Sequence, residues 1–264
     1  MSTTPTRTLD TQELEQRVKG MYDKVARHPD AEFHFATGRA LAERLGYAAD
    51  TLDRIPSPAI DSFAGVGHFL GLADLQPGEA VLDLGSGSGM DSFLAALAVG
   101  PSGRVVGVDM TEQQLAKARG LAADAGVENV DFREGYIEEP PVEPGVFDCV
   151  ISNGVINLSP DKAAVFAAAA RALRPGGRLA IADIVSTEQL PEGVTCDASL
   201  WAACIGGAMQ RDRYREAIES AGLEITAWTE NEQYRFVSER ADNAVRKYGV
   251  TSISLLARRP GPGV

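Results

Sequence analysis

The chain contains little cysteine and no long apolar run. Its 264 residues include three cysteines, Cys149, Cys196 and Cys204, and no CxxC pair, so no disulfide framework is predicted. This cysteine content is typical of a reducing cytoplasm, where we expect the protein to reside. The N-terminus lacks the apolar core of a signal peptide, and the apolar stretches are too short or too broken by glycine to span a bilayer. We therefore expect no membrane partner.

Basic residues are scarce relative to acidic ones. The 25 Lys and Arg stand against 37 Asp and Glu, which gives a formal net charge of -12. No excess positive charge is available to neutralise phosphates, so a nucleic-acid partner is not expected. The sequence also has no His-x-x-x-His pair, cysteine cluster or acidic metal motif, so no metal site is predicted. His28, His34 and His68 are candidate bases, although such histidines are more often hydrogen-bonded at the edge of a core.

From residue 80 onward, strand-like and helix-like segments alternate. The strands are "AVLDL", "RVVGVDM", "VDFREG", "FDCVISN" and "RLAIADIV", the last preceded by a turn, "RPGG"; helices are expected at about Met90 to Val99, in "TEQQLAKARGLAADAG" and in "DKAAVFAAAARAL". This alternation predicts an α/β fold with a doubly wound, mostly parallel, Rossmann-like sheet of seven strands. The final strands, "LEITAWTE" and "TSISLLARR", are separated by a polar stretch without a clear crossover helix, so the last strand is expected to be antiparallel.

The N-terminal part has a helical pattern instead. Leu14 to Ala26 and the segment "FHFATGRALAERLGY" are each amphipathic, and Pro56 and Pro58 interrupt the pattern that follows. We predict two parts: an N-terminal helical cap over residues 1–72 and a catalytic domain over residues 73–264.

The stretch "VLDLGSGSGMD" places Gly85, Gly87 and Gly89 directly after the first strand, which carries Asp83. A glycine-rich turn at this point of a parallel sheet lets a ligand approach the backbone. Asp109 ends the next strand, where a carboxylate can accept hydrogen bonds from both hydroxyls of a ribose. Together these features predict a nucleoside site.

The spacing distinguishes between nucleotide ligands. The pattern is G-x-G-x-G, whereas the dinucleotide fingerprint is G-x-G-x-x-G. Asp91, at the start of the helix, would repel a pyrophosphate. A cationic ligand without phosphate fits better, which disfavours a nicotinamide-dependent oxidoreductase.

Six motifs in register resemble the class I S-adenosylmethionine-dependent methyltransferases, in the branch of the arsenite and ubiquinone/menaquinone enzymes. They are "VLDLGSGSGMD", "GRVVGVDMTEQQLAKAR", "FREGYIEE", "FDCVISNGVINLSPDK", "LRPGGRLAIADI" and "LWAACIGGAM". The resemblance implies S-adenosyl-L-methionine as cofactor. It places Asp83 and the glycines along the methionine part, Asp109 on the ribose and Met110 on the adenine. Tyr136 and Ile137 would border the adenine from the other side, and Ser152 and Asn153 would begin the loop under the sulfonium.

The methyl acceptor is harder to predict, because in-line methyl transfer needs few obligatory side chains. The resemblance implies thiolate ligands for arsenite, and Cys204 matches one of them. Gly154, however, stands where the family has cysteine, and no cysteine precedes Cys149. Our main expectation is therefore a small organic acceptor, with Cys204, Asn153 and Trp201 near the transferred group.

Alternatives remain open. One is an arsenite methyltransferase that uses Cys204, with Cys196 as a recruited second thiolate; another is a non-catalytic relative that keeps the cofactor fold. The sequence leaves a monomer and a homodimer equally open.

Overall fold

The computed structural model describes residues 9–197, 200–201, 205–237 and 239–261. Its strands form one sheet in the order β3-β2-β1-β4-β5-β8-β7, and the additional strand β6 pairs with β5. The bounds are β1 (Ala80–Leu84), β2 (Arg104–Asp109), β3 (Val130–Glu134), β4 (Phe147–Asn153), β5 (Leu173–Ser186), β6 (Met209–Gln210), β7 (Glu224–Glu230) and β8 (Val250–Arg258). The predicted seven strands are present, and β6 adds a short eighth.

The direction of the last strand is confirmed. β8 lies between β5 and β7 and pairs antiparallel with both, whereas the pairs from β3 through β5 are parallel. The sheet is therefore mostly parallel, and β8 runs antiparallel to both of its neighbours.

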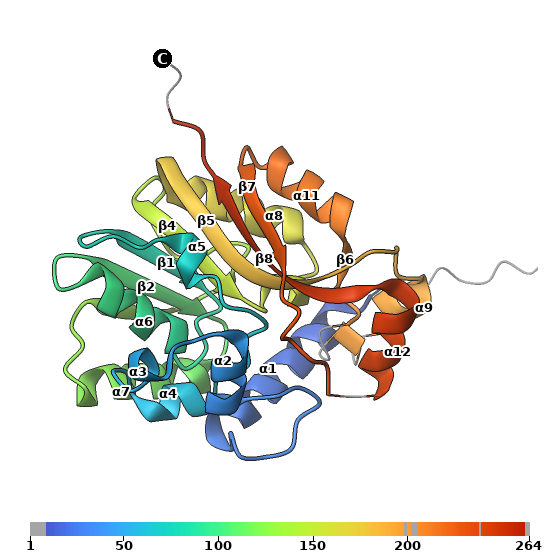
Figure 1. Cartoon of the computed structure of the whole chain (residues 1–264), viewed down its shortest axis with the longest axis horizontal. Coiled ribbons are helices and arrows are strands. Elements are labelled where there is room, and N and C mark those ends of the chain that lie inside the picture. Colours follow the sequence, from blue (N-terminus) through green and yellow to red (C-terminus); the bar gives the residue numbers. More distant parts are fainter. Residues whose placement is uncertain (1–8, 198–199, 202–204, 238, 262–264) are drawn as a thin grey trace, which may run out of the picture.

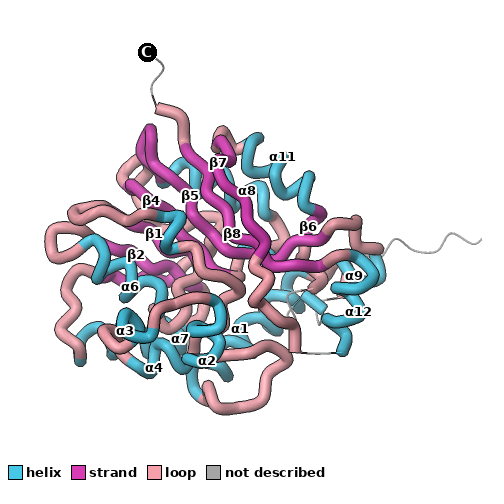
Figure 2. The backbone as a smooth tube through the Cα atoms, in the orientation of Figure 1, coloured by secondary structure: helices cyan, strands magenta, loops and turns pink. Residues whose placement is uncertain are grey.

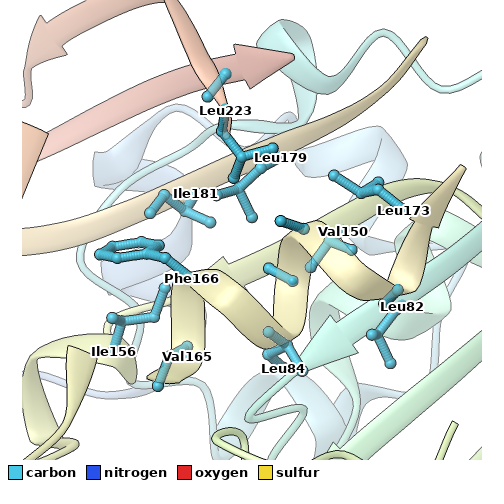
Figure 3. Close-up of a cluster of buried hydrophobic side chains, with 14 of the residues drawn as sticks. Leu82, Leu84, Val150, Ile156, Val165, Phe166, Leu173, Leu179, Ile181 and Leu223 are labelled. Carbon is cyan, nitrogen blue, oxygen red and sulfur yellow. The ribbon is translucent and has the colours of Figure 1, made fainter. Parts of the chain in front are cut away.

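Helices cover both faces of the sheet (Figures 1 and 2). On one face lie α5 (Leu70–Ala73), α6 (Met90–Val99) and α7 (Glu112–Asp124); on the other lie α8 (Lys162–Ala172) and α11 (Arg211–Ser220). Alternate residues of β1 point to opposite faces, so that Val81 joins one apolar cluster and Leu82 the other. Figure 3 shows Leu82, Val150 and Leu179 of three strands in one buried cluster with Phe166 of α8, whose ring lies beside Ile181 and Ile156. Because both faces are covered, the central strands are apolar throughout, and a charged residue such as Asp83 stands out.

The N-terminal segment forms α1 (Thr11–Arg27), α2 (Gly38–Leu45), α3 (Ala49–Leu52) and α4 (Ser57–Asp61). The side chain of Asp10 caps α1 by accepting hydrogen bonds from the backbone of Gln12 and Glu13. These helices, blue in Figure 1, gather below the strands in that view, and α1 packs against α7. A helical N-terminal segment is thus present; the domain boundary at residue 72 stays a prediction.

Two local expectations were wrong. The "FHFAT" part of the second amphipathic segment is not helical; instead the rings of Phe33 and Phe35 stack and α2 begins at Gly38. The "RPGG" turn lies inside β5, as an irregularity in its pairing with β4, where the backbone of Gly176 bonds to Arg259. The polar stretch between β7 and β8 contains a helix, α12 (Glu239–Tyr248), which is not a crossover between parallel strands because β7 and β8 pair antiparallel. Its two basic residues in the last turn favour a helix end.

Two further helical segments are short: the 3-10 helix η1 (Ile156–Leu158) and α9 (Glu192–Thr195). In the described residues, every helix is too short or too polar to cross a bilayer.

Candidate active site

A cavity of about 500 Å³ lies at the carboxyl ends of β1, β2, β3 and β4. Its walls come from the loops that follow these strands, namely residues 85–91, 109–111, 135–139 and 153–161, and from the side of α1. This is the edge at which open parallel sheets bind ligands. The site predicted from the glycine motif is therefore a real hollow.

The glycine loop is folded tightly against β2. Gly85 has a φ of +79°, and its N–H donates to the carbonyl of Val108 at 2.8 Å. A Cβ at Gly85 would lie 2.4 Å from the side chain of Val155, so only glycine fits there. Gly85 and Gly87 line the cavity. Gly89 instead begins α6 and faces Phe132, so its requirement for glycine is a packing one.

Asp109 is held in place by backbone donors. Its Oδ2 accepts from the N–H of Gly87 at 2.9 Å, and its Oδ1 accepts from the N–H of Thr111 at 2.8 Å. Burial raises the pKa of this carboxyl, and the backbone hydrogen bonds oppose that shift. The carboxylate is thus fixed on the cavity wall beside Met110, which also lines the cavity.

The buried carboxyl of Asp83 has a strongly raised pKa. It is 2% exposed, accepts a hydrogen bond from Ser92 Oγ at 2.6 Å, and has a pKa raised to about 8 by burial and then by the nearby charge of Asp91. Burial also raises the pKa of Asp91, to about 6, against hydrogen bonds from Tyr47 and Asn153. When Asp83 and Asp91 are both ionised, their negative charges repel each other. A cation in the cavity would offset this repulsion.

Asn153 connects the sheet to the N-terminal segment. Its Oδ1 accepts from the N–H of Val66 at 2.8 Å, and its Nδ2 donates to Asp91 Oδ2 at 3.0 Å and to Tyr47 Oη at 3.1 Å. Tyr47 Oη in turn donates to Asp91 Oδ1 at 2.6 Å. Tyr47 could not be predicted as part of the site, because nothing in its local sequence pattern distinguishes it from a core tyrosine.

Tyr136 connects the cavity to α1. The ring is 46% exposed, its hydroxyl donates to Glu15 Oε1 at 2.6 Å, and Lys19 Nζ lies 3.0 Å from the same hydroxyl. Ile137 lines the cavity next to it and is buried. A helical cap was expected from the N-terminal segment, but the α1 residues that reach the cavity could not be named, since an amphipathic helix shows which face it buries but not what that face covers.

Other predicted residues lie away from the cavity lining. Ser152 is buried, and its hydroxyl donates to the carbonyl of Leu84 at 2.7 Å, which ties β4 to β1. Trp201 Nε1 donates to the carbonyl of Thr195 at 2.7 Å, and Lys162 Nζ lies 4.6 Å from the Trp201 ring. Cys204 lies outside the described residues. Cys149 is fully buried in β4, which raises the pKa of its thiol to about 12 and makes it unreactive.

The charged side chains that line the cavity, within the described part of the chain, are all carboxylates. Three form what we call the carboxylate floor: Asp83 and Asp91, which are buried, and Asp109, which is half-buried. Four that are partly or fully exposed form the carboxylate rim: Glu15, Glu138, Glu139 and Asp161. Ser86 also lines the cavity, and its buried hydroxyl has no hydrogen-bond partner among the residues that the structure describes. Such a lining suits a cationic ligand that carries hydrogen-bonding groups.

Comparison with known proteins agrees with this geometry. A family model described as a methyltransferase domain matches residues 75–222, more than half of the chain. The chain belongs to the class I S-adenosylmethionine-dependent methyltransferases.

Individual relatives show which methyltransferases the chain resembles. The chain is 42% identical over 221 residues to an arsenite methyltransferase of Halobacterium salinarum, which covers 83% of this chain and 56% of the relative. The crystal structure of an arsenic(III) S-adenosylmethionine methyltransferase from Chlamydomonas reinhardtii superposes with a TM-score of 0.69 at 32% identity, covering 86% of this chain and 76% of the other. A nocamycin O-methyltransferase of Saccharothrix syringae is 40% identical over 125 residues, which is 47% of this chain and 45% of the relative. The chain spans about half the length of the curated relatives it matches.

S-adenosylmethionine is the cofactor of this methyltransferase family, and the residues present fit it. The fixed carboxylate of Asp109 suits a ribose, the unpartnered hydroxyl of Ser86 offers a polar contact, and the raised pKa values of Asp83 and Asp91 fit a cationic ligand. The residue-by-residue placement of the cofactor stays a prediction.

Proposed function

We propose that the protein transfers a methyl group from S-adenosylmethionine to trivalent arsenic. The observation that carries the proposal is the 42% identity to the Halobacterium salinarum arsenite methyltransferase, over a stretch longer than the methyltransferase domain itself. The similarity to the Chlamydomonas reinhardtii structure supports it. The organic acceptor that the sequence favoured becomes the second candidate.

The cavity residues would divide the work of binding the cofactor. Asp109 would hold the ribose, with Met110 and Ile137 on either side of the base. Asp83 and Asp91 would face the cationic methionine part, and Asn153 would keep Asp91 and the loop at residues 66–67 in place. The cofactor, when bound, supplies a methyl group on a positively charged sulfur.

The transfer itself is a displacement at that methyl carbon. The arsenic lone pair forms the new As–C bond while the C–S bond breaks, and its electron pair goes to sulfur, so the positive charge moves from sulfur to arsenic. No proton is lost in this step, so the acceptor needs no general base. The contribution of the protein is alignment of donor and acceptor, exclusion of water, and carboxylates near the charge.

The thiolate ligands of the arsenic would come only in part from the protein. Soft ions prefer sulfur ligands. Cys204 is available in sequence and Cys196 is half-buried at the end of α9. Gly154 replaces the family's cysteine in a left-handed conformation, with a φ of +72°, where a Cβ would lie 3.1 Å from Val66. Small thiols would then complete the arsenic coordination.

The second candidate is methylation of a small organic acceptor. The departure at Gly154 and the burial of Cys149 favour it, as does the similarity to the nocamycin O-methyltransferase over 125 residues.

Methyl transfer assays distinguish the two candidates. The purified protein is incubated with labelled S-adenosylmethionine and either arsenite with 2-mercaptoethanol or a panel of phenols and carboxylic acids, and the products are identified by mass spectrometry. We expect methylated arsenic. Its absence, together with a methylated organic product, would reject the arsenic proposal.

Cofactor binding is tested separately by calorimetry. Asp109→Asn is expected to weaken S-adenosylmethionine binding at least tenfold, because the backbone-anchored carboxylate is lost. The matched control is Asp131→Asn on β3, an exposed carboxylate paired with Arg133. Equal affinities in the two variants would remove Asp109 from the proposed site.

A further inference from the structure

Tyr47 lies directly after α2 and contacts the carboxylate floor from the N-terminal segment. Helix α2 ends at Gly46, which has a φ of +105°, and the N–H of Tyr47 donates back to the carbonyl of Ala42 at 3.1 Å. This left-handed helix end fixes where the Tyr47 side chain leaves the backbone. The residue is only 5% exposed, and its hydroxyl donates to Asp91 Oδ1 at 2.6 Å. A side chain 44 positions away in sequence therefore bonds to the floor.

The two oxygens of Asp91 receive hydrogen bonds from different parts of the fold. Oδ1 accepts from Tyr47 and Oδ2 accepts from Asn153 Nδ2, which also lies 3.1 Å from Tyr47 Oη. Burial and then the charge of Asp91 raise the pKa of the Tyr47 hydroxyl well above its ordinary value, so that it keeps its proton and donates. Both hydrogen bonds stabilise the ionised form of Asp91, which its burial disfavours.

The same two partners of Asp91 also hold one wall of the cavity, formed by residues 63–65. The Tyr47 ring packs edge-on against Phe63, with 5.4 Å between ring centroids. Asn153 Oδ1 accepts from the N–H of Val66 at 2.8 Å, directly after this wall. Asp91 and the wall are thus positioned by one set of side chains.

We propose that Tyr47 is a positioning residue for the cofactor: it holds the ionised Asp91 carboxylate in place for the cationic methionine part of S-adenosylmethionine. The inference rests on the placement of Asp91 in the proposed function. It makes the packing of α2 and of the residues after it a condition for full cofactor affinity. The N-terminal segment is then part of the cofactor site and not only a cover over it.

The titratable groups around Asp91 define the pH range for a test. The charge of Asp91 acts on Asp83 of β1, and Asp109 acts on Asp83 as well. His68 packs on the Tyr47 ring, with 4.4 Å between ring centroids, and burial lowers its pKa, so it is uncharged at pH 7 and above. Without the Tyr47 donor, the pKa of Asp91 should rise above its value of about 6. The variant would then carry more protonated Asp91 at pH 7 than at pH 9.

Calorimetry with S-adenosylmethionine at pH 7 and pH 9 tests the inference. Tyr47→Phe keeps the ring and removes the donor. We expect its affinity to be at least about fivefold lower than that of the unaltered protein at pH 7, and less than about twofold lower at pH 9, where Asp91 is ionised in both proteins. A loss of equal size at the two pH values, or no loss at either, would overturn the inference.

Tyr214→Phe is the matched control. Tyr214 is also buried and donates to a buried carboxyl, Asp183, at the same distance of 2.6 Å, but neither residue lines the cavity. Both variants should be destabilised in urea unfolding, and Tyr214→Phe should keep the cofactor affinity and the pH dependence of the unaltered protein. If the two variants bind the cofactor alike, Tyr47 acts through general stability and the inference fails.

Asp91→Ala tests whether Tyr47 acts through Asp91. Adding Tyr47→Phe to Asp91→Ala should weaken binding by less than about a further twofold, because the partner of the hydroxyl is already gone. Additive losses would overturn the inference and leave the placement of Asp91 intact. If Asp91→Ala alone keeps full affinity, the proposed placement is wrong, and the role of Tyr47 falls with it.

Discussion

At the scale of single residues, the most informative position is Asp83. It is the one charged residue of β1, which is otherwise apolar and buried. Burying this carboxyl costs free energy that packing contacts do not offset. Its pKa of about 8 means that near neutral pH the ligand-free protein holds this carboxyl mostly protonated. In the proposed placement the cationic cofactor favours the ionised carboxylate, so we expect binding to release a proton below pH 8.

The affinity for S-adenosylmethionine should therefore rise with pH and level off above about pH 8. Between pH 7 and pH 9 we expect an increase of about tenfold, since one proton with a pKa of about 8 must leave. Calorimetry across this range, in two buffers of different ionisation enthalpy, measures both the affinity and the released proton. Asp83→Asn should bind more weakly and lose most of the slope, whereas Asp131→Asn should keep it. A pH-independent affinity in the unaltered protein would contradict this account.

At the scale of elements, α1 forms one wall of the cavity through contacts that differ in depth. Leu14 and Val18 are buried against the core, while Tyr136 and Glu15 form an outer hydrogen bond. The outer contact is exposed and contributes little to overall stability, because solvent competes for it. Because this contact lies at the edge of the cavity, we expect it to affect the rate of cofactor release more than the free energy of unfolding.

Tyr136→Phe should accordingly speed cofactor release by about twofold to fivefold and change the free energy of unfolding by less than about 1 kcal/mol. Stopped-flow displacement and urea unfolding measure the two quantities. The control is Glu13→Gln, which breaks an exposed ion pair with Arg17 on the same helix away from the cavity. Similar release rates for the two variants would show that the Tyr136 contact has no part in holding the cofactor.

The elements also show how far sequence reasoning reaches. The strands and the helices α6, α7 and α8 could be predicted, because hydrophobic periodicity and the glycine turn are local signals. Asp83, Gly85, Gly87, Asp109, Met110, Tyr136, Ile137 and Asn153 were found from motif order, and all line one cavity. Tyr47 and the individual contacts of α1 could not be found, since their roles depend on contacts between segments far apart in the chain. Trp201 belongs to a buried apolar cluster, and its three-residue spacing from Cys204 does not fix which way its ring points.

At the scale of the whole molecule, another buried carboxyl links the sheet to two elements packed on one of its faces. Asp183 in β5 is fully buried, accepts from Asn157 Nδ2 at 2.8 Å and from Tyr214 Oη of α11 at 2.6 Å, and has its pKa raised by burial. It connects η1, the sheet and a helix on the outer layer. Its hydrogen bonds therefore bear on global stability.

Tyr214→Phe should destabilise the protein by about 1–3 kcal/mol, because it leaves one buried oxygen of Asp183 without its donor. Urea unfolding should show a lower midpoint with an unchanged slope. Tyr248→Phe, at the half-buried end of α12, is the control and should shift the midpoint much less. An equal shift of the urea midpoint in both variants would show that the hydrogen bond to Asp183 contributes no more to stability than the hydroxyl of Tyr248.

The placement of β8 has a consequence for synthesis. This strand, near the end of the chain, fills the space between β5 and β7, and Ser252 on it donates to the carbonyl of Val66 at 2.6 Å, beside the loop that Asn153 holds. A nascent polypeptide that has not yet released this segment from the ribosome exposes two unpaired sheet edges and lacks part of the support behind its nucleoside pocket. In this strand order β7 joins the sheet, and the loop beside Asn153 gains the hydrogen bond from Ser252, only after β8 has been translated.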